Sequence, residues 1–230
     1  MAEGPHLLAE VQGSRWRVER VLHTEAGRVR FAKLLERVSA PVTELADRAF
    51  ASISETESTQ GILALVRPLA WTWSDLMSDQ PLIVVLDGIQ DPGNVGTIIR
   101  SAEAFGASGL VFAPGCARVS NGKVLRATAG SVFRIPFLEG ILPNELLNRL
   151  AGVPAVLYGL SVDSGDWVQA ANFRQPAALV VGSEGAGVSD DLARSARNIR
   201  IPTQGVESLN AAVACSIALF EAACQRNGWR

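Results

Sequence analysis

The sequence has few of the residues that bind metal ions or form disulfide bonds. It contains three cysteines and two histidines among 230 residues, and no two cysteines stand in a C-x-x-C pair. Structural zinc sites draw on four such ligands, commonly in closely spaced pairs. We therefore predict no metal ion. We also expect the cysteines to be unpaired thiols in a reducing compartment.

Long apolar runs are absent as well. No stretch of the sequence approaches the roughly 20 apolar residues that a membrane span needs. The first residues, MAEGPHLLAEVQ, carry acids where a secretory signal would carry a basic start and a longer apolar run. We expect a cytoplasmic protein that does not interact with a membrane.

The chain has no large excess of charge of either sign, since its formal net charge is −2. Such a charge gives no general attraction to nucleic acid. The basic residues are nevertheless clustered. Residues 14–37 hold a first cluster, made of Arg15, Arg17, Arg20, Arg28, Arg30, Lys33 and Arg37. A second cluster is made of Arg118, Lys123, Arg126 and Arg134. Each cluster is either a solvated face of helices and strands or an RNA-binding surface.

Apolar residues make up 48% of the chain, and their pattern divides it into two parts. Residues 1–67 predict a small α/β domain whose helices and strands alternate. The expected helices are 6–12, 27–38 and 47–54, and the expected strands are 18–24, 41–45 and 61–66. Prolines and polar residues interrupt the pattern over residues 68–80, which we interpret as a linker.

The pattern of strands and helices resumes at Pro81 and continues to residue 230. Strands are expected at 82–87, 109–113, 133–137, 155–160, 177–182 and 198–202, and helices at 95–105, 121–130, 143–151 and 208–226. The strands are almost continuous apolar runs, which is typical of a parallel sheet covered by helices on both faces. The second part is therefore predicted to be a parallel-sheet α/β domain.

The strand 82–87 leads into a loop that contains glycines but fits neither common phosphate-binding motif. Gly93 and Gly96 do not have the spacing of a dinucleotide-binding fingerprint, and no lysine follows Gly96 as a P-loop requires. The polar residues that remain are Asp91, Asn94 and Arg100. Asn94 is a candidate N-cap of the following helix. Arg100 is a candidate for a salt bridge or for a phosphate contact, which suits its planar guanidinium.

Two further loops follow later strands. Residues 180–192 contain three glycines, at 182, 185 and 187, with Glu184 among them. A carboxylate there disfavours an anionic ligand and favours a neutral or cationic one. In the third loop, residues 199–214, Ser208 is a candidate N-cap of the long last helix. Because parallel strands end at one edge of a sheet, we expect these loops to form one polar pocket that includes Asn94, Arg100, Glu184, Ser208 and Asn210.

The three loops resemble, in order, the three motifs of the SpoU (TrmH-like) RNA 2′-O-methyltransferases of the SPOUT superfamily. The matching stretches are DPGNVGTIIRSAEAFGA at 91–107, GSEGAG at 182–187 and IPTQGVESLNAAVA at 201–214. VLRATAGSVFRIPF at 124–137 is similar to a segment between the motifs. The chain departs from the family pattern at Thr203, at Thr128 and over residues 211–214.

The resemblance also reaches residues 1–67. The stretches EGPHLLAE and SETESTQGILALV look like the two ends of the L30e-like RNA-recognition domain of many family members. The resemblance thus implies an L30e-like domain over 1–67, a linker over 68–80 and a SPOUT domain with a deep trefoil knot over 81–230. It further implies a homodimer formed through the knotted domain.

The resemblance also implies a cofactor, S-adenosylmethionine, bound largely by backbone groups inside the knot. The positions carried over from the family are Gly182, Gly185, Ile201 and Leu209, with Tyr158, Gly159 and Leu160 nearby. Glycines suit this task, because a backbone can approach a ligand closely only where no side chain intervenes.

The implied reaction is methyl transfer to a ribose 2′-hydroxyl in rRNA, with 23S rRNA favoured, or in tRNA. Arg100 matches the motif arginine that is often assigned as the general base in this family. A guanidinium, however, has a pKa above about 12 and normally stays charged. The alternative is that Arg100 binds a phosphate and stabilises developing negative charge. Asn94, Glu184, Ser208 and Asn210 are expected to orient substrate or shape the pocket. A methyltransferase acting on an RNA base and a non-catalytic RNA-binding protein are the rival readings.

Overall fold

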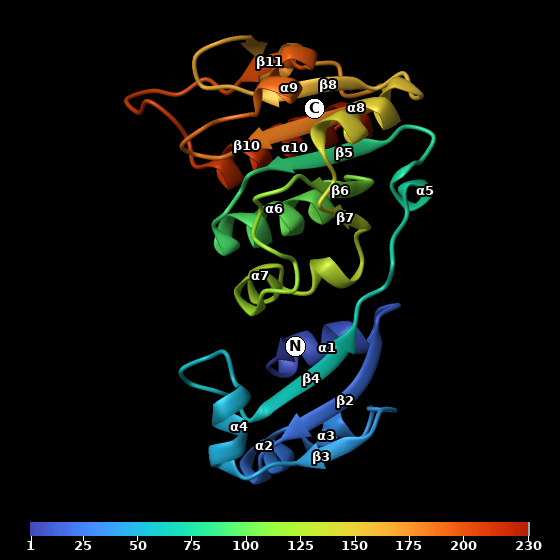
Figure 1. Ribbon diagram of the computed structural model, residues 1–230, viewed down its shortest axis with the longest axis vertical. Helices are drawn as coiled ribbons and strands as arrows, with labels where there is room; N and C mark the ends of the chain where they lie inside the picture. The colour runs from blue at the N-terminus through green and yellow to red at the C-terminus, as the bar shows by residue number, and fades with distance from the viewer. Residues whose placement is uncertain (230) are drawn as a thin grey trace. The chain divides into compact units, whose positions relative to one another are not determined.

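The protein consists of two compact units, which we describe separately. The structure is a computed structural model and describes residues 1–229. The first unit comprises Met1–Ala70 together with Val119–Arg134, and the second comprises Trp71–Arg118 together with Ile135–Arg230 (Figure 1). The two segments of each unit are distant in sequence, so each unit is built from two stretches of the chain.

The first unit contains a four-stranded sheet in the order β1-β4-β2-β3. Its strands are β1 (Ala2–Glu3), β2 (Arg17–His23), β3 (Val42–Glu44) and β4 (Ile62–Arg67). Its helices up to residue 70 are α1 (Pro5–Gln12), α2 (Glu25–Arg30), α3 (Ala32–Leu35) and α4 (Asp47–Ile53). The single helix predicted over 27–38 was wrong, because α2 ends at Arg30 and the next residue, Phe31, has a φ of −116° and a ψ of 27°, which are not helical.

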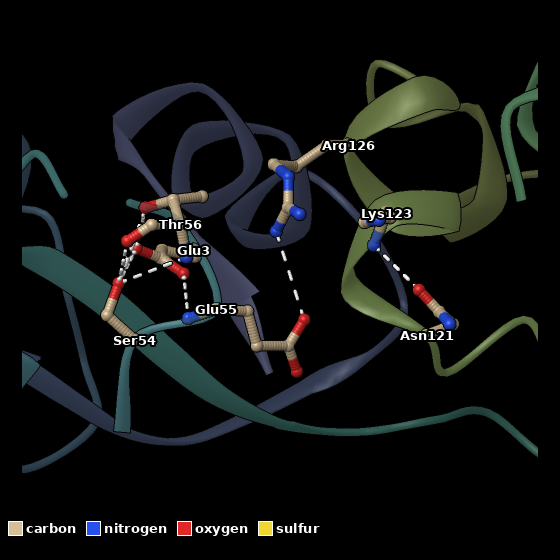
Figure 2. A network of polar contacts seen from close by, with 7 residues as sticks. All are labelled: Glu3, Ser54, Glu55, Thr56, Asn121, Lys123 and Arg126. Carbon is tan, nitrogen blue, oxygen red and sulfur yellow. Dashed lines mark hydrogen bonds and ion pairs between the residues drawn. The ribbon is translucent and has the colours of Figure 1, made fainter. Parts of the chain in front are cut away.

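Residues 119–134 pack against the N-terminal part of the chain within the first unit (Figure 2). They form α7 (Gly122–Ala127) and the 3₁₀-helix η1 (Ser131–Phe133). Phe133 meets the buried Trp16 edge to face, with ring centroids 5.1 Å apart. The strand predicted over 133–137 was therefore wrong in its first half: the chain turns in η1 to bury Phe133, and β7 (Phe137–Glu139) begins only afterwards.

Ion pairs also hold this segment. The Arg126 guanidinium lies 3.9 Å from the Glu55 carboxylate, and Arg134 pairs with Glu10. Two of the four cations of the second basic cluster are thus matched by carboxylates within their own unit. The segment lies in the range predicted for the C-terminal domain, and the boundaries 1–67, 68–80 and 81–230 stay a prediction.

The second unit contains a seven-stranded sheet in the order β7-β6-β5-β10-β8-β11-β9. Its other strands are β5 (Leu82–Asp87), β6 (Gly109–Phe112), β8 (Val156–Leu160), β9 (Asp166–Trp167), β10 (Ala177–Gly182) and β11 (Arg197–Arg200). All six neighbouring pairs are parallel. This confirms the predicted parallel α/β fold, and the trefoil knot stays a prediction.

Helices cover both faces of this sheet. On one face, leucines of α5 (Trp73–Leu76), α8 (Pro143–Ala151) and α9 (Asp190–Ser195) form a buried cluster with Ile83 and Val85 of β5. The long helices α6 (Pro92–Ala104) and α10 (Ala211–Asn227) pack against each other, and α10 also contacts β10. A short 3₁₀-helix, η2 (Val168–Ala170), follows β9. The continuous apolar runs in the strands are explained by this two-sided burial.

The order of the strands creates a switch point between β5 and β10. From β5 the chain proceeds to β6 and β7 on one side, whereas β8, β11 and β9 lie on the other side of β10 (Figure 1). Open α/β sheets bind ligands in the crevice outside the carboxyl ends of strands at such a point. The loops that follow β5 and β10 are therefore the expected location of a site.

Candidate functional site

The loop after β5 delivers Asn94 to the carboxyl edge of the sheet. Asp91 is the N-cap of α6, and its Oδ1 accepts a hydrogen bond of 2.8 Å from the Asn94 backbone N–H. The interpretation of Asn94 as the N-cap was therefore wrong. Because Asp91 satisfies the helix terminus, the Asn94 side chain is available for other contacts.

Asn94, Glu184 and Asn210 come from three loops and meet in one hydrogen-bonded network. Asn94 Nδ2 donates to Glu184 Oε1 over 2.6 Å, and Asn210 Nδ2 donates to the same oxygen over 3.1 Å. Asn210 Nδ2 also donates to Asn94 Oδ1 over 3.0 Å. Side chains that are 90 and 116 positions apart in sequence are thus joined directly. The structure brings together three of the five residues predicted to be catalytic.

Asn210 has a second task at the start of α10. Its Oδ1 accepts hydrogen bonds from the backbone N–H groups of Ala212 and Val213, so it is the N-cap of this helix. Ser208 was expected to open the helix, and this was wrong, because the first helical residue is Ala211. Ser208 is exposed and lines the cavity described below. The orientation of the Asn210 amide is thus set by the helix terminus that it caps.

We expect Asn210→Asp to separate these two tasks. Aspartate caps a helix as well as asparagine does, so the free energy of unfolding should change by less than about 1 kcal/mol. It has no N–H to donate to Glu184 and adds a second carboxylate beside it, so the methyl transfer that the resemblance implies should fall steeply. Thermal unfolding and turnover measure the two effects, and Asn121→Asp at the N-cap of α7 is the control. Wild-type turnover in Asn210→Asp would contradict the role of the network.

A cavity of about 360 Å³ opens beside the network, at the carboxyl ends of β8, β10 and β11. Seven of the predicted residues line it, namely Leu160, Gly182, Glu184, Gly185, Ile201, Ser208 and Leu209. Its other walls include Val162, Ala211 and Ala214, which are apolar, and the carboxylates come from Glu184 and Glu207. No lysine or arginine is among the lining residues of the described chain. We call this the first cavity.

The charge of the first cavity decides which ligands fit it. Two carboxylates without a cation oppose the phosphates of a dinucleotide or a nucleoside triphosphate and favour a neutral or cationic ligand. Apolar walls suit an aromatic ring system such as adenine. At Gly185 a Cβ atom would meet nothing within 4 Å, so backbone groups there are open to a ligand. The lining residues thus fit S-adenosylmethionine, which joins an adenine ring to a positively charged sulfonium.

Gly182 is required by the tight turn that follows β10. A Cβ atom at Gly182 would overlap the backbone of Gly187 and Val188, because the turn after β10 folds back there. Ser183 and Gly187 close this turn through reciprocal backbone hydrogen bonds of 3.1 and 2.9 Å. The glycine therefore permits the turn that shapes the cavity wall.

Apart from Asn94 and Asn210 of the network, three predicted residues do not line the first cavity. Tyr158 is buried in β8, where its ring packs on Phe173 at 5.2 Å and its hydroxyl accepts a hydrogen bond from the Asn172 N–H. Gly159 is also buried, beside Ala196 and Asn198. Arg100 is exposed on α6, and no side chain of residues 1–229 forms an ion pair or hydrogen bond with it. Its predicted role at the reacting atoms stays a prediction.

Sequence reasoning did not identify Ser161, Val162 and Glu207 as lining residues of the first cavity. Ser161 and Val162 follow β8, and Glu207 lies in the loop after β11. Their position directly after parallel strands was the signal that could have identified them.

A second cavity, of about 280 Å³, lies between the loops that follow β5 and β10. It is lined by Gly88, Ile89, Gln90, Asp91, Asn94, Ser183, Glu184 and Gly185. The last three of these also line the first cavity, so the two cavities share a wall. No pattern in the sequence indicated a second cavity.

The chain up to residue 229 contains no cluster of three or more histidine, cysteine or acidic side chains able to hold a metal ion. The three cysteines are free thiols, and Cys215 and Cys224 are buried. Burial raises the pKa of the Cys116 thiol. In the same described part, no helix is both long and apolar enough to cross a membrane.

The parallel α/β sheet and the cavity beside its switch point place this chain among the ligand-binding α/β proteins. Comparison with known proteins specifies the family. Residues 81–220 match the model of the SpoU rRNA methylase family, and residues 1–64 match the MRM3-like substrate binding domain. The chain belongs to the SpoU rRNA methylase family, which confirms the resemblance inferred from the three loops.

The similar proteins include enzymes named for ribosomal RNA. The chain is 33% identical to the 23S rRNA (guanosine(2553)-2′-O)-methyltransferase RlmP of Bacillus subtilis, over 96% of this chain and 86% of that protein. It is 39% identical to the 23S rRNA (uridine(2479)-2′-O)-methyltransferase of Streptomyces viridochromogenes, over 62% of this chain and 52% of that protein. The solved structure of the SpoU methyltransferase AviRb from the latter organism, in complex with AdoMet, superposes with a TM-score of 0.89 and 31% identity, and covers 100% of this chain and 91% of that one.

Proposed function

We infer that this protein methylates a ribose 2′-hydroxyl in large-subunit ribosomal RNA. It is an S-adenosylmethionine-dependent RNA 2′-O-methyltransferase of the SpoU family. The observation that carries the conclusion is the network of Asn94, Glu184 and Asn210 beside a cavity with two carboxylates and no cation.

S-adenosylmethionine supplies an activated methyl group when it is bound. What the chain must add is binding, alignment and help with the loss of the hydroxyl proton. We propose that Gly185, Leu160, Ile201 and Leu209 hold the cofactor in the first cavity, whose carboxylates favour its positive charge. The amides of Asn94 and Asn210 hold Glu184 Oε1 in place, so that the carboxylate keeps one orientation.

Ribosomal RNA is a better candidate substrate than transfer RNA. The relatives named for 23S rRNA include one whose similarity extends over 96% of this chain, including the N-terminal unit. Two structures named for tRNA modification, by contrast, cover only 66% and 67% of it, with TM-scores of 0.57. This supports the view that the N-terminal unit, which matches a substrate binding domain, selects an rRNA.

Within the N-terminal unit we propose that the first basic cluster contacts RNA phosphates. Arg17 and Arg28 lie near the carboxylates of Glu19 and Glu44, whereas Arg30, Lys33 and Arg37 form no ion pair with any described carboxylate. These three side chains belong to exposed residues at or beside α2 and α3. Such contacts are expected to weaken steeply with rising salt concentration. We also propose a cytoplasmic location, in which free thiols are maintained.

The function can be tested with the purified protein and two RNA pools. Calorimetry should detect S-adenosylmethionine binding. Labelled methyl groups should enter rRNA, and not tRNA, from cells that lack this protein. Replacing the mapped target nucleotide by its 2′-deoxy form should abolish transfer, whereas a base methyltransferase would still act. Binding without transfer into either pool would support a non-catalytic role instead.

We further propose that the protein is a homodimer formed through the second unit. On α10, the apolar side chains of Val213, Ile217 and Phe220 are 37 to 47% exposed and share one face. Ala211, Ala212 and Ala218 of the same helix are buried within their own unit. The larger side chains instead form an exposed apolar stripe, which suits a partner.

Ile217→Glu is expected to convert the dimer to a monomer, because a carboxylate in the middle of an apolar interface is costly to desolvate. Light scattering coupled to gel filtration measures the mass directly. Leu142→Glu, at a residue of the same unit that is 52% exposed, is the control and should stay dimeric. A wild-type protein of monomeric mass at micromolar concentration would contradict the proposal.

A further inference from the structure

We propose that the second cavity receives the acceptor nucleoside, and that Gln90 at its rim contacts the base. This proposal rests on the proposed function, because it assigns a place to the RNA nucleotide that is to be methylated. It adds a substrate subsite and a residue that influences which nucleotide is accepted. The family comparison assigns neither.

The second cavity lies where an acceptor site has to lie, directly beside the first cavity. A methyl group can pass between two substrates only if their reacting atoms come within about 3–3.5 Å, so the acceptor site must adjoin the donor site. The second cavity shares Ser183, Glu184 and Gly185 with the first cavity. It also lies between the carboxyl ends of β5 and β10, at the switch point of the sheet. Two adjoining cavities are what a transfer between two ligands requires.

The polar groups that line the second cavity suit a nucleoside better than a phosphate. Its lining includes the carboxylates of Asp91 and Glu184 and contains no lysine or arginine among the described residues. Phosphate groups are therefore disfavoured inside it, whereas a sugar and base are not. A nucleoside would enter with its phosphates directed toward solvent.

Glu184 presents a suitable acceptor to such a sugar. Its Oε1 already receives hydrogen bonds from Asn94 and Asn210, but no residue of the described chain donates to Oε2. A ribose hydroxyl is a hydrogen-bond donor, and a carboxylate oxygen is a strong acceptor. A 2′-hydroxyl bound at Oε2 would lie at the wall that the two cavities share.

Gln90 is the side chain best placed to read the base. Asp91 caps α6, Asn94 belongs to the network, and Ser183 Oγ accepts a hydrogen bond from Ala186 N–H. Gln90 is exposed, lines the cavity and makes no side-chain hydrogen bond to any residue of 1–229. Its carboxamide offers both donors and an acceptor, as base edges do. The Gln90 carboxamide is therefore available to form hydrogen bonds with a ligand.

Steady-state kinetics with undermethylated 23S rRNA tests this assignment. Removing one hydrogen-bonding group from the acceptor site should raise KM for the RNA roughly five- to tenfold in Gln90→Ala, with little change in kcat. Gln90→Trp should block the cavity and abolish transfer. Both variants should bind S-adenosylmethionine with wild-type affinity by calorimetry. Gln80→Ala and Gln80→Trp are matched controls at an exposed glutamine of the same unit that lines neither cavity.

A binding measurement without turnover completes the test. In the presence of S-adenosylhomocysteine, millimolar uridine or guanosine should shift the NMR side-chain amide signal of Gln90 and leave that of Gln80 unchanged. Wild-type KM in both Gln90 variants, or equal shifts at the two glutamines, would overturn the proposal. If the wild-type protein bound S-adenosylmethionine but methylated no RNA, the proposed function itself would fail, and that result is distinguishable from an effect confined to Gln90.

Discussion

Arg100→Ala is expected to lower the rate of methyl transfer by about 10²–10³-fold, the usual cost of removing a group that stabilises developing negative charge. Arg100 is exposed and makes no ion pair or hydrogen bond with any described side chain, so the variant should unfold at the wild-type temperature. It does not line the first cavity, so the affinity for S-adenosylmethionine should also be unchanged. The loss should appear only in the reaction with RNA.

Single-turnover kinetics, thermal unfolding and calorimetry together measure these three quantities. Arg100→Lys keeps the positive charge but not the planar fork, so it should retain part of the activity if the charge acts on a phosphate or an oxyanion. Arg174→Ala removes another exposed arginine of the same unit and is the control. Full turnover in Arg100→Ala would show that this residue has no part in the reaction.

Gly182→Ala is expected to destabilise the protein by about 1–3 kcal/mol, as overpacking commonly does. The added methyl group would overlap the backbone of Gly187. It must therefore push apart the turn over residues 183–187, which forms one wall of the first cavity. Cofactor binding should be lost together with the geometry of this turn.

Gly185→Ala provides the matched comparison, because a Cβ atom there would meet nothing within 4 Å. It should change stability by less than about 0.5 kcal/mol. Denaturant unfolding distinguishes the two variants, and calorimetry with S-adenosylmethionine measures the loss of cofactor binding in Gly182→Ala. Equal stability and equal affinity in Gly182→Ala and the wild-type protein would contradict the close approach of Gly187 as the reason for the glycine.

The convergence of the site was predictable from sequence, because parallel strands end at the same edge of a sheet. Asn94, Glu184 and Asn210 all follow such strands, so their meeting could be predicted from the sequence. The roles at the helix termini were not predictable in the same way. Asp91 and Asn94, or Ser208 and Asn210, are all good N-cap residues, and only the backbone shows which one precedes the first helical turn.

The packing of residues 119–134 within the first unit could not be predicted from the sequence either. Local patterns describe helices and strands, but they do not reveal that Phe133 packs against Trp16, more than a hundred residues away. From the sequence, the second basic cluster could form one surface. In the structure, Arg126 and Arg134 instead pair with Glu55 and Glu10. Tertiary partners of this kind are set by packing, which leaves no periodic signal along the chain.

The two-part construction of the N-terminal unit has a consequence for exchanging RNA targets among relatives. A chimera that transplants only residues 1–70 would leave Phe133, Arg126 and Arg134 of the recipient facing foreign side chains. A larger residue in place of Gly122 would also displace the Glu55 carboxylate, which pairs with Arg126. Swapped enzymes should fold well only when the donor contributes both pieces, so natural divergence in these two stretches is expected to be correlated.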